Sequence, residues 1–164
     1  LLPYTTLFRS SEGGNQYLAD LRQSPERFEP HSRERLLAGA MIPSAWYLQA
    51  QRFRRHTRQA IKSLFSQADV LIAPATPCSA TPIGAEEMVI NGQPLPVRAS
   101  MGMLTQPISF LGLPVVTVPL RTASGKPIGL QLIAAPFNEQ ACLRAARALE
   151  AMGITDARVA ESAA

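Results

Sequence analysis

The amino-acid sequence predicts an α/β fold, because short strand-like runs alternate with longer helical patterns. Three proline-punctuated apolar segments between residues 68 and 135 carry the strand signal. Each contains a short aliphatic run that Pro or Gly closes, so we expect buried strands over residues 70–73, 115–118 and 128–133. We expect the prolines at the strand ends, where a missing N–H breaks no ladder hydrogen bond.

The start of the chain contains turns and short helical patterns. Residues 1–10 (LLPYTTLFRS) are similar to a translated sequencing adaptor, so we treat them as a non-native leader outside the fold. Residues 11–23 end in a short amphipathic segment, and residues 24–32 form a turn-rich connector with two prolines. Ser32 is expected to cap a helix that begins at Arg33.

The clearest helical pattern covers residues 44–66, where small and apolar side chains recur at steps of three and four. Its apolar stripe includes Trp46 and Phe53 and needs a partner surface. The other face is basic and carries Arg52, Arg54, Arg55, Arg58 and Lys62.

The second half offers a hairpin signal and a final helix. Asn91-Gly92 marks a turn within residues 86–99, which form either a small hairpin or a loop. A helix is expected over residues 138–152, with Asn138 as its N-cap and Gly153 after its end. Its apolar stripe comprises Ala141, Leu143 or Cys142, Ala145, Leu149 and Met152. The tail at residues 155–164 is small and polar, and we expect it to fray.

Three strands are too few to close a sheet. Apolar runs such as residues 115–118 need cover on both faces, and the helices of this chain supply only part of it. The pattern therefore predicts an incomplete α/β domain with a sheet flanked by helices.

Composition excludes several classes of protein. The chain has 164 residues, 46% of them apolar, and a net charge of +4, which is typical of one globular domain. No apolar run approaches the roughly 18–20 residues of a membrane span, and the chain does not start with a signal-peptide pattern. Cys78, Cys142, His31 and His56 show no metal-ligand spacing, so we expect no metal site. Two free thiols fit a reducing cytoplasm.

Four blocks in consecutive order resemble the amidase signature family. They are an Arg-x-Arg helix followed by Ala-Gly and Tyr (33–54), DVLIAPATP (69–77), TQPISFLGLP (105–114) and PIGLQLI with a following helix (127–143). The resemblance covers residues 11–154 and implies the C-terminal part of one amidase domain, with a mixed sheet flanked by helices. Within the family, the chain most resembles the branch of 1-carboxybiuret hydrolase-like amidohydrolases.

The resemblance implies an amidohydrolase that cleaves a linear amide or urea-type C–N bond without a metal or an organic cofactor. In the family a serine attacks the carbonyl, and a second serine, held by a cis peptide bond, relays its proton to a lysine. These three residues lie upstream of the matched region, so the resemblance implies no catalytic residue in this chain. We predict that the chain alone is inactive. Residues 9–15 (RSSEGGN) are superficially similar to the nucleophile loop but lack its flanking glycines and any upstream lysine.

The family match also implies a set of substrate-binding residues, namely Arg35, Thr105, Gln106, Pro107 and Ser109. Several relatives place an arginine at position 35 or 33 against a substrate carboxylate, which a guanidinium pairs bidentately. The alternative is an exposed helix residue that pairs with a nearby glutamate. For residues 105–109 the alternative is a turn whose hydroxyls bond local backbone groups.

One departure from the family concerns Gly102. Glutamine-dependent tRNA amidotransferases carry Asp at this position of their amidase component, where it binds the amino group of glutamine. Without that carboxylate a buried substrate ammonium is unpaired, which disfavours glutamine as the substrate.

For partners, the resemblance implies a small amide or urea-type substrate, and either a homodimer or a short helical companion subunit. Two other classes of function stay open: a non-catalytic module that docks through residues 44–66, and a nucleic-acid binder that uses their basic face. Trp46 and Phe53 fall on the opposite stripe of that helix, so we expect no nucleic-acid partner.

Overall fold

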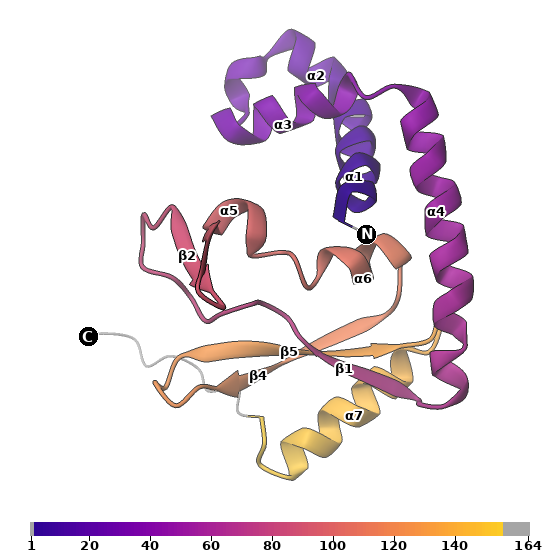
Figure 1. The fold of residues 1–164 in the computed structure, drawn as a ribbon, viewed down its shortest axis with the longest axis vertical. Helices are drawn as coiled ribbons and strands as arrows, with labels where there is room; N and C mark the ends of the chain where they lie inside the picture. The colour runs from indigo at the N-terminus through magenta and orange to yellow at the C-terminus, as the bar shows by residue number, and fades with distance from the viewer. Residues whose placement is uncertain (1, 156–164) are drawn as a thin grey trace. The chain divides into compact units, whose positions relative to one another are not determined.

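A computed structural model describes residues 2–155 of the chain (Figure 1). Almost all of the predicted tail at residues 155–164 lies outside the described residues. The chain divides into two compact units, residues 1–61 and residues 62–164, which we describe separately.

The N-terminal unit is helical. Its elements are α1 (Leu2–Gln16), α2 (Leu18–Gln23), a 3₁₀ turn (Pro25–Arg27), α3 (Pro30–Ala40) and α4 (Ser44–Lys62). Residues 2–10, which we treated as a leader outside the fold, form the first part of α1. Their non-native origin stays a prediction.

Helices α1 and α3 are in contact at glycine positions, where no side chain separates the two backbones. A β-carbon at Gly39 would overlap the backbone of Ser10, and one at Gly14 would overlap the backbone of Ala40. Only glycine therefore permits this close approach of two helix backbones. The Ala-Gly step of the family pattern thus has a packing reason in this chain.

Helix α3 begins earlier than predicted, and Glu29, not Ser32, is its N-cap. The Glu29 carboxylate accepts hydrogen bonds from the backbone N–H groups of His31 at 3.2 Å and Ser32 at 2.8 Å. Pro30 occupies the first helical position, where no N–H is needed. The helix therefore starts within the segment that we predicted to be a connector.

Helix α4 confirms the predicted helical pattern up to Lys62, and a 3₁₀ turn at Leu64–Ser66 follows it. Phe53 of its apolar stripe stacks on Tyr4, with ring centroids 4.5 Å apart. Trp46, assigned to the same stripe, is 55% exposed. The N-terminal unit therefore leaves part of this stripe in water.

The C-terminal unit combines two sheets with three helices. Its elements are β1 (Val70–Pro74), β2 (Glu87–Ile90), β3 (Gln93–Pro96), α5 (Val97–Ser100), α6 (Gln106–Leu111), β4 (Val115–Arg121), β5 (Pro127–Ala134) and α7 (Glu139–Ala151). All three predicted strands are confirmed as β1, β4 and β5. The Asn91-Gly92 signal resolves into the hairpin β2–β3, because both residues have positive φ, as a two-residue type I′ turn requires.

The main sheet has the strand order β1-β5-β4, and both of its pairings are antiparallel. Strand β5 is central, which explains why residues 131–134 of β5 are all buried. Both outer strands keep one unpaired edge within the described residues. The predicted α/β fold is confirmed. The predicted mixed sheet would also contain parallel pairs, and these would have to involve strands other than the described ones.

The prediction that prolines stand only at strand ends is wrong for Pro119, which lies inside β4. Thr122 N donates to Lys126 O, so these two residues form a hydrogen-bonded pair. Hydrogen-bonded and non-hydrogen-bonded pairs alternate along an antiparallel ladder. Counting back three residues, Pro119 and Gly129 form a non-hydrogen-bonded pair, and the backbone groups of Pro119 point away from β5. An edge strand tolerates Pro there, because no ladder bond is lost.

Helix α7 packs against one face of the main sheet, and α6 lies on the other side (Figure 1). Cys142 of α7 is fully buried with Ala141 and Ala134, whereas Leu143 is 59% exposed. Of the two alternatives for the α7 stripe, Cys142 is therefore correct. Met152, also assigned to the stripe, is 70% exposed.

Candidate functional site

The predicted substrate-binding segment forms the start of α6. Thr105 precedes the helix, Gln106 and Pro107 open it, and Ser109 lies on an exposed side of its second turn. Thr105 Oγ1 donates to Gly102 O at 3.2 Å, and Gln106 N donates to the same oxygen at 2.9 Å. The Thr105 hydroxyl thus bonds local backbone, as one of the two interpretations of this segment predicted.

Gln106 lies over Gly102. A β-carbon built at Gly102 would stand 3.1 Å from Gln106 Nε2 and 3.5 Å from its Cγ. A side chain at position 102 would require the Gln106 amide to shift by a few tenths of an ångström. Gly102 therefore leaves room for a neutral amide where the tRNA amidotransferases are expected to carry a carboxylate.

Gln131 ties this segment to the main sheet. Its side chain lies on the central strand β5 and is 2% exposed. Nε2 donates to Pro74 O at 2.8 Å and to Leu104 O at 3.3 Å. One buried amide therefore joins the end of β1 to the residue before Thr105.

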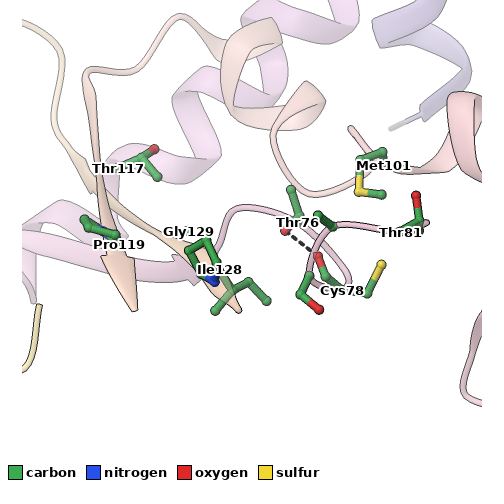
Figure 2. Close-up of a pocket in the computed structure, with 11 residues that line it drawn as sticks. Thr76, Cys78, Thr81, Met101, Thr117, Pro119, Ile128 and Gly129 are labelled. Atoms are coloured by element: carbon green, nitrogen blue, oxygen red, sulfur yellow. Dashed lines mark hydrogen bonds between the residues drawn. The ribbon is translucent and has the colours of Figure 1, made fainter. Parts of the chain in front are cut away.

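A cavity of about 550 Å³ opens at one end of the main sheet (Figure 2). Its walls come from Thr76 and residues 78–81 after β1, from Met101, from the middle of β4 and from the start of β5. The polar lining consists of hydroxyl groups, and none of the lining residues is charged. The hydroxyl-bearing residues are Thr76, Ser79, Thr81 and Thr117. The rest of the lining is apolar, so the cavity combines an apolar wall with a few hydroxyls, as pockets for small molecules commonly do.

Gly129 forms part of the lining of this cavity and permits its shape. A β-carbon there would stand 2.8 Å from both the β-carbon of Ala75 and Cγ2 of Thr117. A side chain at position 129 would force the Ala75 and Thr117 side chains to shift. Glycine at this position of β5 therefore leaves space for the side chains of the two flanking segments.

None of the five predicted substrate-binding residues lines this cavity. Arg35 is exposed on α3 of the N-terminal unit, and Arg33 is half-buried. Sequence reasoning missed the hydroxyls at residues 76–81, although their recurrence in TPCSAT between prolines was visible. The pairing of β1 with β5, extended by the Ala75 N–H bond to Gly129 O at 2.8 Å, brings the start of this loop to Gly129.

The N-terminal unit has a separate cavity of about 330 Å³ beside α1, α3 and α4. Tyr47 OH donates to Glu12 Oε1 at 2.9 Å and accepts from Gln51 Nε2 at 2.7 Å. The Tyr of the family pattern thus joins α4 to α1.

The two thiols are free, Cys142 in the core and Cys78 at the cavity. Cys78 Sγ lies 3.6 Å from Met88 Sδ, a contact that offers the thiol no base. Among the described residues, no three His, Cys, Asp or Glu side chains gather where they could hold a metal ion.

The family model for amidases matches residues 10–143, so the chain belongs to the amidase family. None of the described helices combines the length and apolarity that crossing a bilayer requires.

The more specific resemblance to 1-carboxybiuret hydrolase is confirmed as well. The chain is 53% identical over 147 residues to the AtzE subunit of 1-carboxybiuret hydrolase from Pseudomonas sp. strain ADP. It is 37% identical over 137 residues to a glutamyl-tRNA(Gln) amidotransferase subunit of Roseiflexus sp. strain RS-1. These alignments cover 88% and 80% of this chain, but 32% and 27% of the relatives.

Solved structures agree with this assignment. A vestigial protein complex that reveals the origins of an s-triazine catabolic enzyme superposes with a TM-score of 0.87 at 50% identity. A crystal structure of an amidase superposes with a TM-score of 0.82 at 30% identity. They match 94% and 90% of this chain, and 34% of each of those chains. The chain thus spans about a third of the length of the relatives it matches.

Proposed function

We propose that the chain is the C-terminal part of an amidohydrolase that cleaves a linear amide or urea-type C–N bond. The 53% identity to a subunit of 1-carboxybiuret hydrolase, over most of this chain, is the observation that carries the proposal. We propose further that the Ser–cis-Ser–Lys triad lies in a part of the parent protein that precedes this chain.

The residues around α6 support the proposed substrate class. Gly102 and the neutral amide of Gln106 offer no carboxylate to a substrate ammonium, which supports a urea-like substrate over glutamine. Arg35 is proposed to pair with a substrate carboxylate, and residues 105–109 to position the amide. The uncharged cavity near Met101 is compatible with a small neutral group.

Partners and location are part of the same proposal. A short helical companion subunit is supported by the s-triazine enzyme structure, which is described as a vestigial protein complex. A homodimer is the alternative assembly. The two free thiols support a cytoplasmic location.

The test uses a chimera in which residues 11–154 replace the matching segment of the Pseudomonas sp. protein AtzE. Ammonia release from 1-carboxybiuret is expected from the chimera and not from this chain alone, because the proposed triad would come from the AtzE part of the chimera. Turnover by the purified chain that survives repurification would contradict the location proposed for the triad. A folded chimera without activity would contradict the proposed substrate class.

A further inference from the structure

The turn between β5 and α7 holds an aromatic residue in an unfavourable backbone conformation. Asn138 N donates to Ala135 O at 3.1 Å, which closes a four-residue turn. Phe137, the third residue of this turn, has φ +65°. In this left-handed region the β-carbon crowds the following carbonyl oxygen, so Gly or Asn is preferred. The local backbone therefore disfavours the residue that occupies it.

The exposure of the Phe137 ring to water is unfavourable as well. Phe137 is 94% exposed, so the C-terminal unit buries almost none of its ring. Its support is well anchored, since Ala134 at the end of β5 and Ala141 and Cys142 of α7 lie together in the core. The fold thus presents a large apolar ring on a fixed turn, at a cost in both backbone strain and apolar exposure.

We propose that Phe137 is an anchor by which this chain docks into an apolar pocket of the parent enzyme's remaining part. This inference rests on the proposed function, in that the parent is a longer amidase. The chain superposes over 94% of its length on a structure of which it spans only 34%. Residue 137 falls inside the family match at residues 10–143. The turn therefore belongs to the shared fold, and two thirds of that fold is available to cover it.

The chemistry of the site favours an internal partner over a polar or charged one. The anchor offers a phenyl ring, and buried aromatic anchors in well-packed pockets carry much of the free energy of protein interfaces. A pocket for Phe137 would offset both the strain and the exposure at one residue. A second copy of this chain is the competing occupant, and its signature is an effect that depends on concentration.

The test compares two variants in two contexts. Phe137→Asn removes the ring and relaxes the left-handed backbone, whereas Phe137→Leu keeps an apolar side chain and the strain. In the chimera, Phe137→Asn should lower the folding equilibrium constant by about tenfold or more, and Phe137→Leu by less. In this chain alone, Phe137→Asn should lower the 8-anilinonaphthalene-1-sulfonate (ANS) fluorescence, because it relaxes the backbone strain and removes an exposed ring.

The opposite signs are what a merely structural residue would not produce. Stabilisation of the chimera by Phe137→Asn would overturn the proposal, because the ring would then be exposed there too. Equal losses in both contexts would mean that the ring stabilises the C-terminal unit itself, and a concentration-dependent loss in this chain alone would mean a second copy. A chimera that does not fold would exclude the relative's remaining part as a model of the partner. Opposite signs in a folded but inactive chimera would support the anchor and contradict the proposed substrate.

Discussion

Arg35 is the predicted substrate-binding residue whose setting the structure changes most. A helix that began at Arg33, as predicted, would place Arg35 in its first turn, where the helix dipole also favours an anion. Helix α3 begins at Pro30, so Arg35 stands in the second turn, and the dipole effect is confined to the first. Any contribution of Arg35 to anion binding therefore has to come from its guanidinium.

In the chimera, Arg35→Ala is expected to lower kcat/KM for 1-carboxybiuret by about 30- to 1000-fold, because a bidentate ion pair with the substrate carboxylate is lost. An uncharged amide of similar size should be hydrolysed at nearly the unsubstituted rate. Steady-state kinetics on both substrates provide the measurement.

Arg33→Ala is the matched control, because its side chain projects from another side of the helix and is half-buried. Equal losses on charged and neutral substrates would show that Arg35 is structural. A loss confined to Arg33→Ala would assign the carboxylate to that arginine instead.

At the scale of elements, one side chain connects strand β5 to the loop before α6. Gln131 donates to the carbonyl oxygens of Pro74 and Leu104, and both bonds span long stretches of sequence. Helix α6 has only one and a half turns. Its position therefore depends on such contacts more than on its own backbone hydrogen bonds.

Gln131→Leu in the chimera should reduce the free energy of unfolding by about 1–3 kcal/mol, because two carbonyl groups lose a buried donor. Amide hydrogen exchange should rise at residues 101–106, next to the released Leu104 carbonyl. Gln131→Glu is the shape-matched control, and it should behave at least as badly because it also lacks the donor. Unchanged protection at residues 101–106 in both variants would show that Gln131 only fills space.

At the scale of the whole molecule, the C-terminal unit leaves apolar strand surface in water. Ile72 of edge strand β1 is 63% exposed, and Val115 of edge strand β4 is 37% exposed. Both strands also keep an unpaired edge within the described residues. Edges and faces of this kind bind other strands and apolar dyes.

The isolated chain is therefore expected to be poorly soluble or partly molten. Strong ANS fluorescence together with weak near-ultraviolet circular dichroism would be the result. The chimera, which restores the neighbouring chain, should show the reverse. A sharp, cooperative thermal transition from a monomer of this chain alone would speak against the expectation.

The sequence by itself determined the features that depend on neighbouring residues. The three strands and helices α4 and α7 follow from short-range patterns of apolar and turn residues, and the structure confirms them. The Asn91-Gly92 turn also follows from its local signal, whereas the structure decided between a hairpin and a loop. The family also follows from local blocks in a set order, which the comparison with the amidase family confirms.

Only the tertiary structure decided what depends on residues far apart in the chain. Pro119 is tolerated inside β4 because that strand lies at an edge, and strand order cannot be read from a single strand. Cys142 is buried in place of Leu143 because the sheet face selects one side of α7. The cavity combines the loop after β1 with Thr117 and Gly129, which the antiparallel pairing of β1 and β4 with β5 brings to the same part of the sheet. The sequence pattern of one element indicates which of its side chains share a face. Which other element packs against that face depends on residues far away in the chain, so only the tertiary structure shows it.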